Sequence, residues 1–337
     1  MHIPLAVRMA RQTAGVRSIS TLRPPLVDIR CFHEDIRTNF NDDQRHKAAH
    51  AAGKACRTHG LLAVPFRGGI APEIAEEAFV SVKRLFALPL ERKLELALTD
   101  LRENVGYIQQ GNEAPDPNQI APDPKEVFQF QPGKRALPKE LEEPLEALFY
   151  AGMAAGRATL RALSRSLDLP DDETFARAAS NLDLCSLRAI HYPGGVEPLA
   201  NRCGAHSDFG MCSLLLNEHG GAPGLQAADN VTGEWRNVEA PDGAEQGGAG
   251  VAFVNLGDML ARWTNDEVVS TRHRVVAPAT PADAARSRFV IALFCDADGP
   301  TSLEPLPQFV SVSRPAKYPR QLAGDFKAMR LAGQTTI

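Results

Sequence analysis

Short apolar runs separated by turn-forming residues fill the chain from residue 181 onward, and this alternation constrains the fold more than any other feature. Each run is about as long as a β-strand and too short for a typical helix. Breaks such as Pro193-Gly194-Gly195 and Gly220-Gly221 supply the turns. Many short strands at regular spacing are typical of a sandwich or jelly roll. The predicted strands are Cys185–Tyr192, Cys212–Leu216, Gly224–Ala227, Trp235–Val238, Val251–Asn255, His273–Val276 and Phe289–Phe294.

The chain before residue 181 has a helical pattern instead. Asp42 or Asp43 can cap one helix, and Pro72 suits the first turn of another. Leucines, alanines and a methionine form an apolar stripe at helical spacing over residues 139–168. We therefore expect helices at about residues 42–58, 72–89 and 139–168, and a C-terminal helix at Gln321–Leu331.

A long loop is expected between these helices, because residues 103–137 are rich in Pro, Gly, Asn and Asp and show no sustained period. Gly106-Tyr107 and Lys125–Phe128 are the ordered stretches that we expect within it.

The length of 337 residues suits one elaborated core with a helical annex. We predict a mainly β fold, in which a double-stranded β-helix, or jelly roll, is flanked by N-terminal helices. The predicted organisation is a leader at 1–24, a helix-rich region at 25–170, the jelly-roll core at 181–300 and a C-terminal segment with a helix at 301–337.

Charge and cysteine usage exclude several classes of protein. The net charge of −4 offers no broad positive field for a phosphate backbone, so we expect no nucleic-acid partner. The six cysteines are scattered without CxxC pairs, which argues against a zinc knuckle and a disulfide framework and favours a reducing compartment. No apolar run approaches the roughly 20 residues that span a bilayer, so we expect no membrane partner. We expect a monomer in the cytoplasm.

The first 24 residues differ from the rest of the chain. They contain four arginines, several serines and threonines, and no acidic residue, which is the composition of a mitochondrial transit peptide. A disordered leader has the same composition, and Pro4 weakens any amphipathic helix. Mitochondrial localisation is therefore the alternative to the cytoplasm.

The stretch "HSDFG" places His206 and Asp208 just ahead of the apolar run Met211–Leu216. Residues two apart on a strand point to the same face, with alpha carbons about 6.5 Å apart, so we expect the imidazole and the carboxylate side by side. A second histidine would complete a facial metal site of the non-haem Fe(II) type, and His273 opens a predicted strand whereas His219 sits in a Gly-rich turn. The alternative is a surface turn in which Asp208 caps backbone amides.

The surroundings of these residues resemble a known family. The blocks "AHSDFGMCSLLL", "GLQAADNVTGEWRNV", "FVNLGDMLARWTNDEVVSTRHRVV" and "SRFVIALF" look like the catalytic core of the isopenicillin N synthase-like 2-oxoglutarate/Fe(II)-dependent dioxygenases, in the same order. The N-terminal blocks "PLVDI", "CRTHGLLAVPFRGGI" and "LFALPLERKLEL" are similar to that family's helical part, and "GYIQQGNE" and "KEVFQF" to its middle. The resemblance covers about residues 25 to 320.

The resemblance implies roles in binding iron or 2-oxoglutarate for five residues. His206, Asp208 and His273 match the iron ligands, which are also the catalytic residues. Arg288 matches the arginine that binds the far carboxylate of 2-oxoglutarate, and a guanidinium fork suits a carboxylate. Tyr192 matches the tyrosine that reaches the same carboxylate. The Gly257-Asp258 turn and Asn265 match positions with a structural role.

Two positions depart from the family pattern. Val290 stands where serine is usual, and Ile190 where asparagine is frequent. A lost hydrogen bond to a charged group removes roughly 1.5 to 3 kcal/mol, so weaker 2-oxoglutarate binding is expected. An isopenicillin N synthase-like Fe(II) oxidase that does not use 2-oxoglutarate is therefore the alternative.

The function implied is oxidation of a small metabolite, of the kind found in secondary metabolism, by Fe(II), 2-oxoglutarate and O2 with release of succinate and CO2. Hydroxylation, desaturation and ring closure all remain open. A binding module without catalysis is the third hypothesis. We expect the substrate to contact the loop Tyr107–Glu126, the strand before His206 and the C-terminal segment. Arg188, Asn201, Arg202 and Cys203 are candidates to point inward, or else to serve backbone turns.

Overall fold

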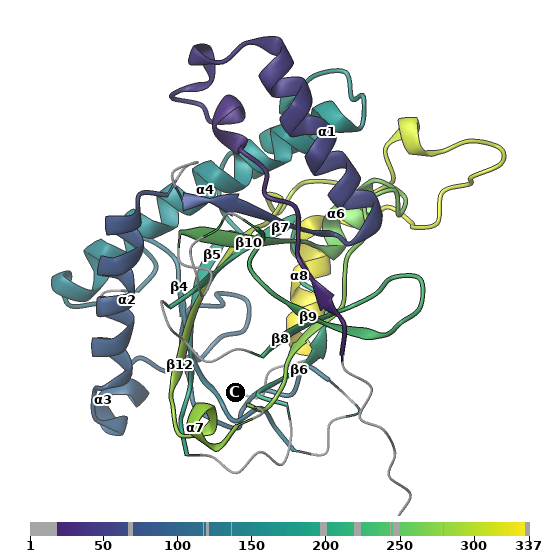
Figure 1. Ribbon diagram of the computed structural model, residues 1–337. Helices are drawn as coiled ribbons and strands as arrows, with labels where there is room; N and C mark the ends of the chain where they lie inside the picture. Colours follow the sequence, from purple (N-terminus) through teal and green to yellow (C-terminus); the bar gives the residue numbers. More distant parts are fainter. Residues whose placement is uncertain are drawn as a thin grey trace, which may run out of the picture.

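The computed structural model describes residues 19–333 except 67–69, 117, 119–120, 136, 196–200, 219–223, 243, 245–249 and 279. Two β-sheets form a jelly roll, and helices cover one side of it (Figure 1). The predicted fold class is confirmed. Within the described residues, no helix is both long enough and apolar enough to cross a membrane.

The larger sheet contains seven strands, and every neighbouring pair in it is antiparallel. Its strands are rich in apolar residues because one face packs on helices and the other lines the interior. The order is β2 (Leu61–Pro65), β10 (Val251–Leu256), β7 (Cys212–Asn217), β12 (Arg288–Cys295), β5 (Ser186–Tyr192), β4 (Glu126–Phe130) and β3 (Gly106–Ile108).

The smaller sheet supplies the opposite wall of the interior. Its strands β6 and β11 pair so that His273 lies directly opposite His206. The sheet order is β1 (Thr21–Leu22), β9 (Trp235–Val238), β8 (Leu225–Ala228), β11 (His273–Val275) and β6 (Cys203–His206).

The helices confirm the predicted pattern in the first half of the chain. Asn41, and not Asp42 or Asp43, caps α1 through a reciprocal pair of hydrogen bonds with Gln44. The α-helices are α1 (Asp42–Thr58), α2 (Pro72–Phe86), α3 (Leu90–Leu94), α4 (Lys139–Ser166), α5 (Glu173–Ala176), α6 (Asp258–Trp263), α7 (Pro281–Ala284) and α8 (Ala323–Ala332), with 3-10 helices at Ile29–Phe32, Arg37–Asn39, Arg177–Ala179 and Pro307–Phe309.

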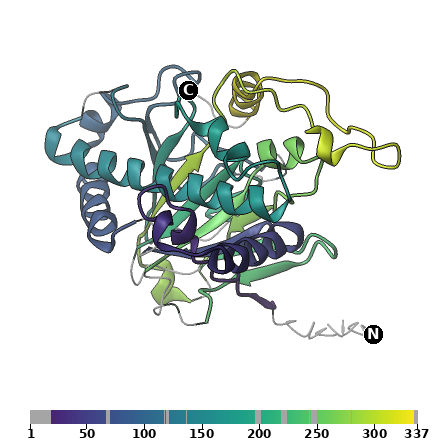
Figure 2. The same ribbon diagram turned by 90° about the horizontal axis from the view of Figure 1, so that it is seen from above.

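Helix α4 packs closely on the larger sheet, and Figure 2 shows it (teal) running across the strands. Glycine in α4 permits this approach, since a Cβ at Gly152 would lie 2.3 Å from the Cδ1 atom of Leu293 on β12. The helical layer therefore holds the outer face of the larger sheet, whose inner face forms one wall of the cavity and carries Arg288.

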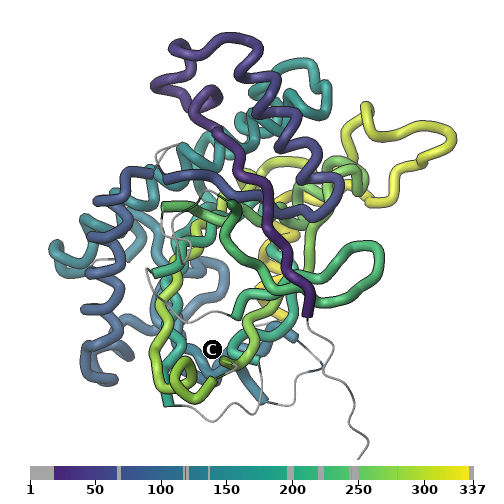
Figure 3. Tube along the Cα trace, in the orientation of Figure 1, coloured from purple at the N-terminus to yellow at the C-terminus, as the bar shows by residue number. Residues whose placement is uncertain are grey.

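Several strands in the structure were not assigned bounds from the sequence. Both ordered stretches predicted within residues 103–137 are strands, β3 and β4, and they extend the larger sheet. The strand expected before His206 is β6, but no bounds were predicted for it, because Cys203–His206 is short and carries no alternation. Residues 1–18 of the predicted leader lie outside the described residues, whereas Thr21–Leu22 pairs with β9 (Figure 3).

Candidate active site

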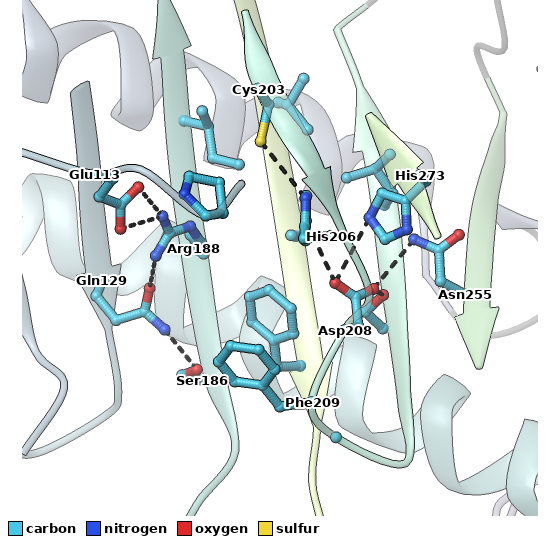
Figure 4. Close-up of a pocket in the computed structure, with 18 of the residues that line it drawn as sticks. Glu113, Gln129, Ser186, Arg188, Cys203, His206, Asp208, Phe209, Asn255 and His273 are labelled. Carbon is cyan, nitrogen blue, oxygen red and sulfur yellow. Dashed lines mark hydrogen bonds and ion pairs between the residues drawn. The ribbon is translucent and has the colours of Figure 1, made fainter. Parts of the chain in front are cut away.

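Two histidines and one aspartate meet in the interior between the sheets (Figure 4). The Nε2 atoms of His206 and His273 lie 3.9 and 3.7 Å from the Oδ1 atom of Asp208. One ligand atom from each of the three residues falls within 4.8 Å of the others. The predicted triad is therefore assembled in space.

The local geometry of this triad corrects the sequence-based argument. His206 is the last residue of β6, but Asp208 lies in the turn after it and not on the same strand. The turn is fixed by backbone hydrogen bonds from Asp258 N to Asp208 O (2.9 Å) and from Met259 N to Phe209 O (3.0 Å). The start of α6 thus aims Asp208 at the histidines, a contact that strand periodicity does not describe.

Backbone carbonyls select the tautomer of both histidines. The Nδ1 atom of His206 lies 2.8 Å from Gly204 O, and that of His273 lies 3.2 Å from Thr271 O. A carbonyl can only accept, so each Nδ1 carries the proton and each Nε2 presents its lone pair to the interior. Burial lowers the pKa of His273, which favours the neutral imidazole that a metal requires.

Asp208 is held through its other oxygen. Oδ2 accepts hydrogen bonds from Ser213 Oγ and from Asn255 Nδ2, the latter at 3.2 Å. Burial acts to raise the pKa of the Asp208 carboxyl, but the two imidazoles and these hydrogen bonds outweigh it and leave the pKa below its usual range. Oδ1 therefore stays ionised and faces the two histidines, where it can coordinate a metal.

The donor set suits divalent iron. Two neutral imidazole nitrogens and one carboxylate oxygen on one side of a point leave the other side open, which is the 2-His-1-carboxylate arrangement of non-haem Fe(II) oxygenases. The carbonyls behind the histidines and the donors behind Asp208 supply the outer hydrogen bonds that such ligands need.

Arg288 supplies a buried positive charge to the same cavity. It is the first residue of β12, and its Nη2 donates to Asn217 Oδ1 at 2.8 Å. Its Nη1 is buried without a hydrogen-bond partner, and no carboxylate pairs with it among the described residues. Tyr192 lies opposite it in the β5–β12 register, with the guanidinium 5.3 Å from the ring centre. A buried cation of this kind calls for an anion.

The two departures from the family pattern lie beside this arginine. Val290 and Ile190 face each other in the β5–β12 register and form part of the apolar cavity wall. Asn217 stands opposite Val290 on the other neighbour, β7, and its amide orients Arg288. Sequence reasoning missed Asn217 because only the strand register brings it to this position.

The remaining candidates separate into two groups. Arg188 and Cys203 line the cavity, and Cys203 Sγ lies 3.8 Å from His206 Nδ1. Arg202 does not line it and donates to Arg286 O at 3.3 Å. Asn201 is also outside the lining, and His219 lies outside the described residues.

The turn residues have structural roles. Asp258 accepts hydrogen bonds from Ser207 (3.0 Å) and Ser270 (2.6 Å), so it ties the segments next to both histidines together. Asn265 has a φ of 53° and donates to Phe309 O at 3.0 Å.

Comparison with known proteins agrees with this chemistry. Residues 25–147 match the family described as non-haem dioxygenase in morphine synthesis, N-terminal, and residues 184–297 match the 2OG-Fe(II) oxygenase superfamily. The chain belongs to the 2-oxoglutarate/Fe(II)-dependent dioxygenases. The predicted family is confirmed.

Several individual dioxygenases resemble the chain over most of its length. The crystal structure of a full-length Neurospora crassa protein in complex with alpha-KG is 27% identical, with a TM-score of 0.77, and the match covers 94% of this chain and 98% of that one. The 2-oxoglutarate-dependent dioxygenase caaD of Aspergillus niger is 25% identical, covering 83% and 86% of the two chains. Clavatol oxidase claD of Penicillium crustosum is 28% identical, covering 74% and 80%.

This dioxygenase is an enzyme that uses Fe(II), 2-oxoglutarate and O2 to oxidise a small molecule. The predicted cofactors are confirmed. The comparisons favour a 2-oxoglutarate-dependent dioxygenase over an Fe(II) oxidase that does not use 2-oxoglutarate and over a binding module without catalysis. The fungal relatives fit a place in secondary metabolism.

Proposed function

We propose that His206, Asp208 and His273 hold the iron of this dioxygenase, and that Arg288 binds the far carboxylate of 2-oxoglutarate with Tyr192 beside it. One observation carries the proposal. The same cavity contains three converging metal donors and a buried guanidinium nitrogen that has no partner. A dicarboxylate that chelates the metal at one end satisfies the arginine at the other.

The bound iron and 2-oxoglutarate supply the oxidising chemistry, in which 2-oxoglutarate loses CO2 to give succinate as the substrate is oxidised. The protein contributes position and electrostatics. The carbonyls of Gly204 and Thr271 fix the imidazole orientation, and Ser213 and Asn255 hold the carboxylate. The apolar wall beside Arg288 limits water, which strengthens the pairing between guanidinium and carboxylate.

An anaerobic titration tests these assignments. Addition of Fe(II) and then 2-oxoglutarate to the metal-free enzyme should produce the visible absorption of an Fe(II)–2-oxoglutarate chelate. Asp208→Ala should abolish the absorption, whereas Asp266→Ala, which removes a surface carboxylate, should leave it intact. Retention of iron binding by Asp208→Ala at wild-type affinity would contradict the ligand assignment.

We infer that the enzyme is a cytoplasmic monomer without a nucleic-acid partner, with mitochondria as the alternative compartment. We also infer that the chain is organised as a helix-rich region at 25–170, a jelly-roll core at 181–300 and a C-terminal segment with a helix at 301–337. The net charge of −4 supports the absence of a nucleic-acid partner. Light scattering of the purified chain and imaging of a C-terminally tagged chain test the oligomeric state and the compartment.

A further inference from the structure

A second polar cluster faces the triad across the cavity (Figure 4). Arg188 of β5 donates from Nη2 to Glu113 Oε1 at 2.6 Å and from Nη1 to Gln129 Oε1 at 3.3 Å. Gln129 in turn donates to Ser186 Oγ at 2.7 Å. The arginine side chain keeps 17% of its surface accessible, whereas Glu113 keeps 8%. None of these four residues, which we call the Arg188 cluster, has a part in holding iron or 2-oxoglutarate.

The charges of the Arg188 cluster are already balanced within the protein. Lys125, also on the cavity wall, pairs with Glu113 at 3.3 Å and with the fully buried Asp123. Burial acts to raise the pKa of Glu113, but Arg188 and Lys125 hold that pKa at about 2, so the carboxylate stays ionised. The cluster and its lysine–aspartate neighbours thus contain two cations and two anions.

The other charges around the cavity are balanced in the same way. Lys327 of α8 donates to Asp296 Oδ2 at 2.7 Å. Arg288 and Asp208 remain, and together with Fe(II) they match the two negative charges of 2-oxoglutarate. Among the described residues that line the cavity, no charged group is left to neutralise a charged substrate.

Asp296 leaves one unsatisfied acceptor beside the substrate space. The residue is 2% exposed, and its Oδ1 has no hydrogen-bond partner. That oxygen lies against Gly210, where a Cβ would come within 1.9 Å of it, so the glycine of "HSDFG" makes room for the carboxylate. Because Oδ1 is buried against this glycine and Oδ2 pairs with Lys327, Asp296 offers no free charge to a substrate.

We propose that the substrate of this dioxygenase is an uncharged small molecule with a polar edge that accepts a hydrogen bond from Arg188. Amides, imides and phenols have such an edge. The apolar remainder packs against cavity residues such as Phe209, Phe294 and Leu215. The inference rests on the proposed placement of iron and 2-oxoglutarate, because those two ligands use the remaining charges.

Ligands that differ only in charge test directly whether the cavity prefers uncharged molecules. A panel of ring compounds is prepared with each ring as the carboxamide, the carboxylate and the aminomethyl form, beginning with benzamide, benzoate and benzylamine. Binding to the enzyme loaded with 2-oxoglutarate and the redox-inert Ni(II) is measured by thermal shift and calorimetry. Neutral members should bind, and their charged partners should bind at least about tenfold more weakly, because an unpaired ion is costly to bury.

Charge variants provide the second arm. Glu113→Gln leaves an excess positive charge in the Arg188 cluster and should shift the preference toward carboxylates by about tenfold or more. Glu173→Gln removes a carboxylate from the buried Arg161 outside the cavity and should not shift it. If Glu113→Gln does not fold, Lys125→Gln tests the opposite sign and should favour the amines.

The outcomes separate this inference from the proposed function. Loss of Ni(II) binding in Asp208→Ala and of 2-oxoglutarate binding in Arg288→Met, together with selection of neutral ligands, supports both the proposed function and the substrate class. Two outcomes overturn the substrate class alone, provided that cosubstrate binding is normal. In one, a charged member of the panel binds best; in the other, no neutral member binds more tightly than its charged partners. Wild-type cosubstrate binding by Asp208→Ala and Arg288→Met overturns the proposed function.

Discussion

Replacement of Arg288 by methionine should have opposite effects on cosubstrate binding and on the stability of the empty protein. Arg288 is 3% exposed, and one nitrogen of its guanidinium is buried without a hydrogen-bond partner. A buried charge that gains a carboxylate with 2-oxoglutarate contributes about 3 to 4 kcal/mol to that complex, so Arg288→Met should weaken 2-oxoglutarate binding roughly 100- to 1000-fold. The empty protein loses an uncompensated buried cation, so its free energy of unfolding should stay unchanged or rise.

Arg161 provides the matched control. It is also almost fully buried, but its Nε donates to Glu173 at 2.8 Å and its Nη1 to Phe32 O at 3.3 Å. Arg161→Met should therefore destabilise the protein by about 3 kcal/mol and leave 2-oxoglutarate binding unchanged. Calorimetric titration and urea unfolding measure both quantities. The reasoning is refuted if Arg288→Met binds 2-oxoglutarate like the wild type, or if it destabilises the empty protein as much as Arg161→Met does.

Four further changes have expected outcomes. Ser213→Ala removes a donor to Asp208 Oδ2 and should lower Fe(II) affinity about 10- to 100-fold in a competition assay with a chelator. Asn217→Leu removes the amide that orients Arg288, so KM for 2-oxoglutarate should rise about fivefold in a succinate assay while KM for substrate stays constant. Gly152→Ala places a methyl against Leu293 and should lower stability by about 1 to 3 kcal/mol in urea unfolding. Glu126 contacts Lys93, Tyr107 and His191, which outweigh the effect of burial and hold the pKa of its carboxyl at about 2. The stabilising contribution of Glu126 is present above the unfolded pKa near 4.5 and is lost as pH falls toward 2. The stability advantage of the wild type over Glu126→Gln should therefore shrink across that interval.

The sequence predicts the elements well where local chemistry decides them. Strand β9 has the predicted bounds and His273 begins its strand as expected, whereas β12 begins at Arg288, one residue before the predicted Phe289. Strand β6 is expected only as a strand before His206, and its bounds escape prediction because its four residues, two of them small, have no period of their own. It becomes a strand through pairing with β11, which is a tertiary contact.

The sequence predicts the proposed metal-binding residues of the site, but not the residues that hydrogen-bond to them. His206, Asp208 and His273 are found from residue type and from the resemblance, but Ser213 and Asn255 contact Asp208 through the register of β7 and β10. A single sequence does not specify register between strands that lie far apart along the chain. The Arg188 cluster depends likewise on the β4–β5 pairing, which brings Gln129 opposite Arg188.

Anomalous diffraction at the iron edge from anaerobic crystals soaked in Fe(II) and 2-oxoglutarate tests the central assignment most directly. We expect one strong peak bonded to His206 Nε2, His273 Nε2 and Asp208 Oδ1, with 2-oxoglutarate density extending from that peak to Arg288. A peak at other residues, or a cosubstrate carboxylate that contacts Arg188 and leaves Arg288 unpaired, would contradict it.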